Sequence, residues 1–403
     1  MKDYTIIEQE CRETSRISAA VIDEFLLYYA AEKYNLERDL NLKLGKFIHI
    51  TKRFPKEWIN RLKSQYIIHK VFKAEGLIGK ILNHAALQRL NREEIGFLEF
   101  QAAHPWKFSF SIIKEIPADD FYVMEDVFRE EEYLLYSPGI TKTRADQTII
   151  LWFNLIGFNG SCWQSYGPIG AYRSFEPDDI FFFATEIEPC IACENDLLIH
   201  LESNPVPYMM LLSGANYPLV FNKEHQMIMC TAEHEVLHLF PKNLSDRFIT
   251  EYNKGICRLS LKRWAVPPHF SQAYFNEAQS TVVLSAMTDR GFQALVEGFN
   301  AYGYGFPGEP DIRVHLTMIT TASDILRKKI NLLPYEHLFD KESTPAQKED
   351  IDKLNDLLKL ALPEINAGRQ PNIKALAKKA GVDPQVAEDV IRHTMERLNK
   401  MQS

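Results

Sequence analysis

The stretch His234-Glu235-Val236-Leu237-His238 decides between two interpretations of this chain, because its chemistry depends on the backbone that carries it. On a helix, two imidazoles four residues apart lie on one face and can bind a single Zn²⁺. Glu235 would then act as general base toward the metal-bound water. On a strand, His234 and His238 share one face of a sheet, and Glu235 lies on the other.

A third metal ligand is needed for a zinc hydrolase. Asn276-Glu277-Ala278 resembles the Asn-Glu-Ala that supplies the glutamate ligand in thermolysin-like gluzincins. The resemblance implies Glu277 as that ligand. A zinc-dependent hydrolase would therefore use His234, His238 and Glu277 as metal ligands and Glu235 as its catalytic base.

The pattern around the motif favours a strand. Residues 227–240 alternate with period two, which places His234, Val236 and His238 on one face. Pro241 would end a helix shortly after His238, although a zinc-binding helix usually continues further. We therefore expect two ordinary strand histidines and no cofactor, with a bound zinc ion as the alternative.

Composition indicates a globular protein of several domains. A length of 403 residues predicts about two to four domains. Hydrophobic residues make up 46% and charged residues 25%, which is ordinary for a folded domain. No apolar run has membrane-spanning length, and the first residues lack a signal-peptide pattern. We expect a cytoplasmic protein without a membrane partner.

The 6 cysteines are too few and too scattered to predict a disulfide framework. Cys190-Ile191-Ala192-Cys193 is a lone CxxC, which would need a second pair nearby to bind zinc. The ordinary interpretation is two buried thiols.

Charge is unevenly distributed. The segment 43–80 holds ten Lys or Arg against two Glu, a net charge of +8, whereas the whole chain has a net charge of −8. Aromatic residues alternate with these cations at Phe54, Trp58 and Tyr66. Such a segment could bind single-stranded nucleic acid by stacking and phosphate contacts. The alternative is a solvated helix face with the aromatics in the core. The candidate nucleic-acid-binding residues are Lys52, Arg53, Lys56, Arg61 and Lys63.

Periodicity predicts an α+β multidomain protein in four parts. Residues 1–105 follow helical spacing and form a helical domain. Residues 106–190 contain short aromatic strands separated by turn residues, typical of a small antiparallel β barrel or sandwich. Residues 191–340 follow a βαβα order, which favours a ferredoxin-like α+β domain, and include one strand expected over 248–261. Residues 341–403 form a helical, helix-turn-helix-like module.

Within that module, residues 372–387 resemble the helix-turn-helix of lactose-repressor-type regulators. The resemblance implies a close helix contact at Ala377, a turn at Gly381, and packing of Val382 and Val386 between the helices. It would also place the second helix in the DNA major groove. The residues that would face DNA there include several carboxylates, which oppose phosphate binding. A helical module that packs or binds a partner is therefore favoured over a DNA reader.

These observations predict a non-enzymatic interaction or binding protein with a protein or nucleic-acid partner. The partner would contact the basic helices of 43–80 or the terminal module. The zinc-dependent hydrolase remains the alternative.

Overall fold

The chain divides into two compact units. Unit 1 comprises Met1–Ala215 and Thr317–Ile330, and unit 2 comprises Asn216–Leu316 and Asn331–Ser403. The computed structural model describes residues 4–144, 149–215, 217, 219–222, 225–236, 244–262, 269–339, 345–366 and 369–402. None of the helices in these ranges is long and apolar enough to cross a membrane.

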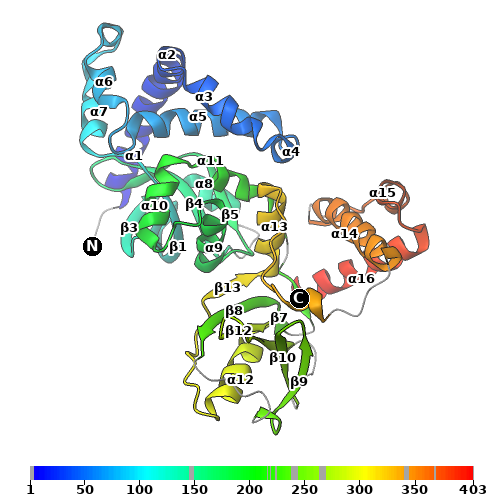
Figure 1. The fold of residues 1–403 in the computed structure, drawn as a ribbon. Helices are drawn as coiled ribbons and strands as arrows, with labels where there is room; N and C mark the ends of the chain where they lie inside the picture. The colour runs from blue at the N-terminus through cyan, green and yellow to red at the C-terminus, as the bar shows by residue number, and fades with distance from the viewer. Residues whose placement is uncertain are drawn as a thin grey trace. The chain divides into compact units, whose positions relative to one another are not determined.

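Unit 1 begins with a helical layer, as the sequence predicts for its first hundred residues (Figure 1). Its first helix runs without a break from Tyr4 to Lys33 and includes a π-helical stretch. The last helix is capped by Asn91, whose side chain accepts the N–H groups of Glu93 and Glu94. The elements are α1 (Tyr4–Ser18), η1 (Ala19–Leu26), α2 (Leu27–Lys33), α3 (Leu36–Gly45), α4 (Ile48–Thr51), α5 (Lys56–Phe72), α6 (Ile78–Leu82), η2 (Ala85–Arg89) and α7 (Arg92–Ala103).

The change from helices to strands at residue 106 is confirmed, and the strands that follow close into a barrel. Its order is β1-β2-β3-β5-β4, with β4 pairing back onto β1. All neighbours are antiparallel except β3 and β5, which are parallel, so the predicted all-antiparallel pairing is corrected at one position. The strands are β1 (Lys107–Ala118), β2 (Phe121–Asp126), β3 (Glu131–Tyr136), β4 (Leu151–Phe158) and β5 (Trp163–Tyr172), with α8 (Pro138–Arg144) between β3 and β4.

The long first strand makes the closure possible. The N-terminal part of β1 pairs with β4 and its C-terminal part with β2, and the register shifts at Ile113 and Glu115. Such irregularities bend a strand and increase its twist. Alternate residues point inward, so that Tyr122, Met124 and Trp152 lie in one buried cluster inside the barrel.

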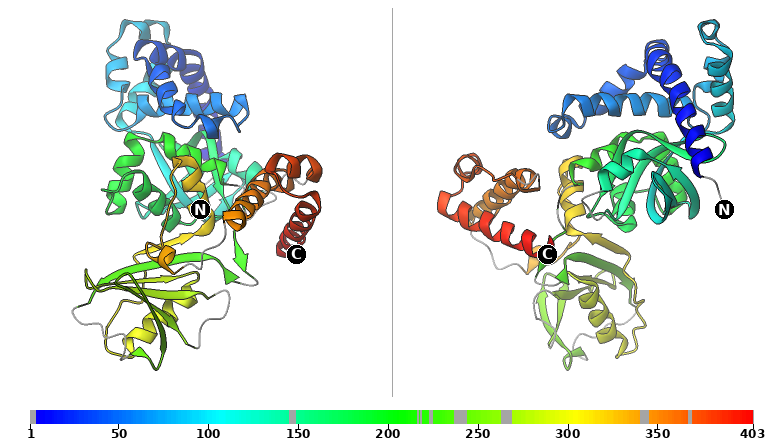
Figure 2. Two further views of the ribbon diagram at one scale, coloured as in Figure 1. Left: turned by 45° about the vertical axis from the view of Figure 1, so that its right-hand side comes forward. Right: turned by 180° about the vertical axis from the view of Figure 1, so that it is seen from behind.

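Further helices complete unit 1 (Figure 2). The predicted boundary at residue 190 falls between α9 and α10, yet both helices belong to unit 1 with the barrel. Glu202 on α10 accepts the backbone N–H of Phe108 on β1. These helices are α9 (Pro177–Ile187), α10 (Glu194–Ser203), α11 (Val206–Met209), η3 (Met210–Ser213) and α13 (Leu316–Leu326), the last contributed from Thr317 onward.

Unit 2 contains a six-stranded sheet in the order β13-β8-β12-β11-β10-β9. The helix α12 covers one face through Phe292, Leu295 and Phe299, and η5 lies beside a cluster on the other face. A separate two-stranded sheet pairs β6 with β7. The elements are β6 (Phe221–Asn222), β7 (His225–Gln226), β8 (Ile228–Glu235), β9 (Phe248–Asn253), β10 (Ile256–Leu261), β11 (Ser271–Asn276), β12 (Thr281–Ala286), α12 (Asp289–Asn300), β13 (Ile312–His315) and η5 (Glu336–Leu338).

Two expectations for this sheet need correction. The run 248–261 is not one strand but the hairpin β9–β10, which turns at Lys254 and Gly255, both with positive φ. The predicted succession β12, α12, β13, α13 is present, but the sheet is not ferredoxin-like. In the described residues α12 covers it, α13 belongs to unit 1 from Thr317, and a β9–β12 meander extends it.

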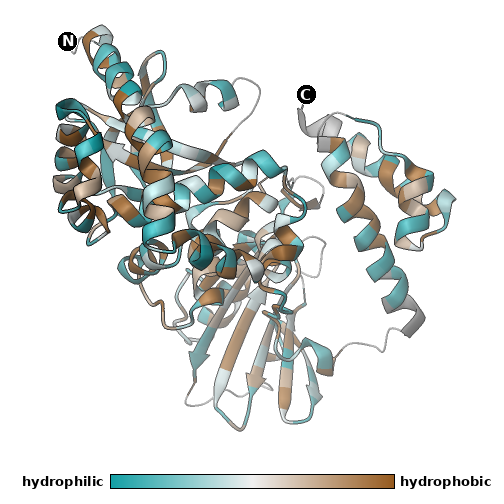
Figure 3. Cartoon of the chain, turned by 90° about the horizontal axis from the view of Figure 1, so that it is seen from above, coloured by the Kyte–Doolittle hydropathy of each residue, from teal (hydrophilic) through white to brown (hydrophobic). Residues whose placement is uncertain are grey.

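The C-terminal part of unit 2 consists of α14 (Pro345–Asn366), α15 (Ile373–Ala380) and α16 (Pro384–Gln402). Apolar residues recur along these helices (Figure 3). Leu357, Ala361, Ala377, Ala387 and Ile391 are fully buried among them and form a small core.

Candidate nucleic-acid interface

The turn between α4 and α5 carries the basic residues that the sequence singles out. Pro55 has φ −58° and ψ 148°, which starts α5 at Lys56. On α5, Leu62 is buried, whereas Lys56 and Arg61 are exposed to solvent. Lys52, at the end of α4, is also exposed. The amphipathic start of α5 therefore places cations from two helices beside one turn.

Two of the five predicted residues have structural partners. Arg53 binds Asp324 of α13 with both nitrogens, at 2.6 and 3.2 Å. His49 of α4 contacts the Asp324 carbonyl oxygen at 2.8 Å, so α4 and the turn after it are both fixed to α13. Lys63 lies 3.5 Å from Glu37. Among the described residues, Lys52, Lys56 and Arg61 make no ion pair, and we name these three residues the cationic triad.

The aromatic residues of this region separate into two groups. Phe54 and Trp58 are half-buried and stack on one another, with ring centroids 4.2 Å apart and an angle of 29°. Tyr66 is fully buried, so it cannot offer a stacking face as the sequence suggested. The half-buried pair lies within the sequence span of the cationic triad.

A partly buried polar cluster around Tyr66 was not predicted. The Tyr66 hydroxyl donates to Asp39 at 2.5 Å and accepts from Lys43 at 2.8 Å. Lys70 lies over the same ring, 5.4 Å from its centroid. Burial, with the nearby charges of Lys43 and Lys73, lowers the pKa of Lys70 to about 8. The i, i+4 spacing of Tyr66 and Lys70 on α5 was the only sequence signal, since Asp39 and Lys43 come from α3.

The outer face of β2 and β3 is covered by α1. Phe121 and Tyr136 on this face are buried in a cluster with Tyr4, Ile7 and Cys11 of α1. The rings of Tyr4 and Phe121 lie 5.1 Å apart. A nucleic acid could reach this face only if α1 moved away.

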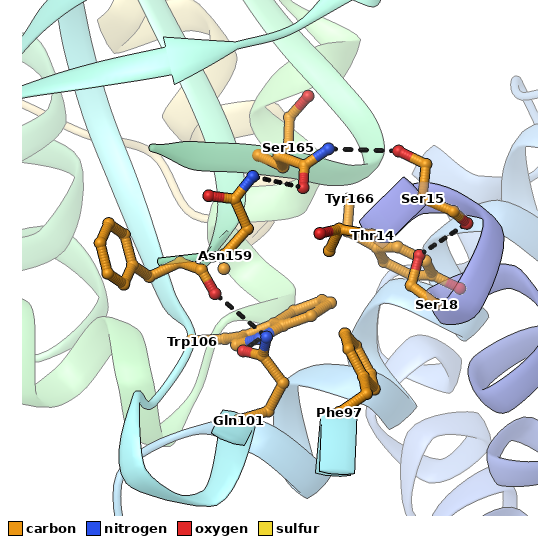
Figure 4. A pocket seen from close by; sticks show the side chains of 12 residues that line it. Thr14, Ser15, Ser18, Phe97, Gln101, Trp106, Asn159, Ser165 and Tyr166 are labelled. Carbon is orange, nitrogen blue, oxygen red and sulfur yellow. Dashed lines mark hydrogen bonds between the residues drawn. The ribbon is translucent and has the colours of Figure 1, made fainter. Parts of the chain in front are cut away.

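A small polar pocket lies beside α1 (Figure 4). Its volume is about 50 Å³, which is room for about three water molecules. The Trp106 indole N–H donates to Gln101 Oε1 at 2.7 Å at its base. The walls are formed by hydroxyl and amide groups of α1 and of the barrel, namely Thr14, Ser15, Ser18, Asn159, Gln164 and Ser165.

The proposed zinc residues do not converge among the residues that the structure describes. His234 and Glu235 lie on β8, which confirms the strand prediction for these two residues. The His234 ring stacks on Phe306 at 4.6 Å, and Glu235 is exposed on the opposite face. His238 lies outside the described residues. No group of three His, Cys, Asp or Glu suited to a metal ion occurs in the described ranges.

Glu277 lies in the turn between β11 and β12. Asn276 Oδ1 accepts the N–H groups of Ala278 at 3.0 Å and Gln279 at 3.2 Å. The Asn-Glu-Ala sequence thus has a local structural role, since an asparagine side chain often closes a turn in this way.

Two helices occur where the repressor-like resemblance expects them. Gly381 has φ +68° and ends α15, and Ala377 is fully buried. Val386 is 44% exposed, so the packing expected of it is corrected: Ala387 and Ile391 occupy the core instead. Burying Ala387 in place of Val386 rotates the buried face of α16 by about 100° around the helix axis.

The exposed cysteines are a further correction. Cys190 and Cys193 were expected to be buried, but both are exposed, Cys190 in a turn and Cys193 as the residue just before α10.

Comparison with protein-family models, with curated proteins and with solved structures finds no match for this chain.

Proposed function

We propose that the protein is a non-enzymatic binding protein that takes single-stranded nucleic acid on the α4–α5 face. The observation that supports this most is the combination of the cationic triad with the stacked pair Phe54 and Trp58. When a cation without an acidic partner contacts a phosphate, counterions condensed on the nucleic acid are released, and this release favours binding. Half-buried rings offer a surface for base stacking, which needs no particular base.

Arg53 has a different role in this proposal. Its pair with Asp324 anchors the turn to α13, and this anchoring keeps the triad in place before the ligand arrives. Glu57 is exposed on the first turn of α5, next to Lys56, and opposes phosphate binding there. The three cations of the triad outweigh this one carboxylate, so the face still favours phosphates.

The C-terminal module is not part of the proposed interface. Gln385 and Glu388 are exposed at the start of α16, and Asp383 accepts the N–H groups of Gln385 and Val386. Carboxylates at this helix start would repel phosphate.

Fluorescence anisotropy with a labelled mixed-sequence DNA of about 20 nucleotides tests the proposal over a salt series. We expect log K against log salt to fall with a slope of about −2, from three phosphate contacts on a single strand. Each change Lys52→Ala, Lys56→Ala or Arg61→Ala should make that slope shallower by about 0.7. Trp58→Leu should weaken binding about tenfold and leave the slope unchanged, because stacking releases no counterion.

The matched control is the triple variant Lys142→Ala, Arg144→Ala, Lys329→Ala, which removes the same charge from exposed positions elsewhere in unit 1. It should bind like the unmodified protein. Absence of binding at about 20 mM salt would exclude the α4–α5 face as the interface. Equal losses in the control and in the triple variant Lys52→Ala, Lys56→Ala, Arg61→Ala would exclude it as well.

A further inference from the structure

Two cysteines that are 151 residues apart in the sequence meet inside unit 1. Cys11 lies on α1, and Cys162 lies in the loop between β4 and β5. Their sulfur atoms are 3.2 Å apart, and both side chains are almost completely buried, at 0% and 1% exposure. Cys11 is also part of the cluster through which α1 covers the outer face of β2 and β3.

The surroundings hold both sulfur atoms in position. The Asn159 side-chain amide donates to Cys11 Sγ at 3.3 Å and to Cys162 Sγ at 3.7 Å. Its carbonyl oxygen accepts the backbone N–H groups of Ser161 and Cys162 at 2.9 and 2.8 Å, which fixes the loop. Gln164 donates to the Cys11 carbonyl oxygen at 3.0 Å. Hydrogen bonds from Asn159 and Gln164 therefore hold α1 against the β4–β5 loop next to the thiol pair.

The two thiols differ in acidity. The hydrogen bond between the two thiols lowers the pKa of Cys11, against the opposing effect of burial, and the Asn159 amide adds to this lowering. The same hydrogen bond and burial raise the pKa of Cys162. The Asn159 amide lies closer to Cys11 Sγ than to Cys162 Sγ, which favours Cys11 as the attacking thiolate and leaves Cys162 to react second.

We propose that Cys11 and Cys162 are a redox modification site, which a hydroperoxide converts into a disulfide that fastens α1 across β2 and β3. The Cys11 thiolate attacks one peroxide oxygen, the O–O bond breaks, and water leaves with the proton that Cys11 released. Cys162 then attacks the sulfenic sulfur of Cys11, the S–O bond breaks, and a second water carries away the Cys162 proton. The two thiols lose two electrons, and hydrogen peroxide is reduced to two waters.

The pocket in Figure 4 lies next to the residues that hold the thiol pair. Asn159 and Gln164 line this pocket, and both also contact Cys11. Because both thiols are buried, the pair should respond to small hydroperoxides and resist exchange with large disulfides while the protein is folded.

Peptide mapping of the full-length protein tests the proposal. Reduced protein is treated with hydrogen peroxide, its free thiols are blocked with N-ethylmaleimide, and it is digested without reductant. We expect one cross-linked peptide pair containing Cys11 and Cys162, lighter by two hydrogens than the sum of its parts. Amide exchange in α1 should slow at least about tenfold, because the cross-link opposes the opening that exchange requires.

Variants assign the roles. Cys190→Ser, Cys193→Ser removes the exposed thiols and should leave the cross-link intact. Cys162→Ala should trap a sulfenic acid on Cys11 that dimedone labels, whereas Cys11→Ala should give no dimedone label at Cys162. A cross-link confined to Cys190 and Cys193 would overturn the proposal. A Cys11–Cys162 cross-link that forms only after denaturation in urea would also overturn the proposal. This comparison of folded with denatured protein uses the unmodified chain, so it does not depend on the folding of a variant.

Discussion

At the scale of single residues, the most consequential buried group in unit 1 is His69. Its side chain is completely buried on α5, and its Nε2 lies 2.6 Å from Glu202 on α10. Glu202 also accepts from Phe108 and contacts Arg129 at 3.3 Å. Burial lowers the pKa of His69, and the hydrogen bond with Glu202 opposes that effect only in part.

A pH-dependent stability follows from His69. Its folded pKa lies below the ordinary value of 6.5, so the unfolded chain binds the proton first. Unit 1 should therefore lose stability as the pH falls below 6.5, by at most about 1.4 kcal/mol per pH unit for one proton. Urea midpoints measured by tryptophan fluorescence between pH 7.5 and 5.5 should show the decline, and His69→Gln should flatten it.

His393→Gln removes an exposed imidazole and is the control, since it should not alter the decline in unit 1. An equally steep decline in His69→Gln would mean that other groups titrate, and His69 would lose this role.

At the scale of elements, α5 is fixed to the barrel through Gln65. Its side-chain amide donates to the carbonyl oxygens of Tyr166 at 2.9 Å and Pro168 at 3.0 Å. Between them, Gly167 has φ +79°, and a Cβ there would lie 2.9 Å from Gln65 Cβ. The helix can approach β5 this closely only because the strand has a glycine at that position.

Gly167→Ala should destabilise unit 1 by about 2–3 kcal/mol, from backbone strain and from the contact with Gln65. Gln65→Ala should cost about 1–3 kcal/mol, because two carbonyl oxygens lose their donor. The double variant should cost less than the two single changes together, since Gln65→Ala removes the Gln65 Cγ and Nε2 atoms, each 3.1 Å from the new methyl group. Gly79→Ala is the control: no atom lies within 4 Å of its Cβ, and alanine favours the helix. Strictly additive costs in urea denaturation would refute the close contact.

At the scale of the whole molecule, each unit has its own core. The barrel cluster of unit 1 and the sheet–helix cluster of unit 2 share no residue. Trp58, Trp106, Trp152 and Trp163 belong to unit 1, so their fluorescence reports on that unit.

We expect each unit to unfold with its own transition. Phe292→Ala in α12 removes a ring that is 1% exposed and should destabilise unit 2 by about 3–5 kcal/mol. In a Trp264→Phe background, the fluorescence transition of unit 1 should shift by less than about 0.5 kcal/mol, while circular dichroism detects an earlier loss of structure. Phe183→Ala, which acts on a fully buried ring of unit 1, should show the opposite pattern. Coincident shifts in both measurements would contradict separate transitions.

Local chemistry determined several features of this protein by itself. The alternation before Val236 predicted the strand that carries His234, Pro55 marked the start of α5, and Gly381 marked the end of α15. Each depends on a period or on a backbone angle that a residue shares only with its chain neighbours. The exposed positions of Lys52, Lys56 and Arg61 were predictable for the same reason, since helical spacing separates them from the buried face.

The tertiary structure alone decided what these elements meet. Barrel closure by β3 and β5, the pair of Arg53 with Asp324, and the contact of Cys11 with Cys162 each join residues far apart in the sequence. No local sequence pattern selects such partners. Many alternative pairings of helices and strands bury a similar apolar area, and they differ only in how well all the elements pack together. The same limit explains why Tyr66 became core while Trp58 stayed half-buried, although both are aromatic residues of the same basic segment 43–80.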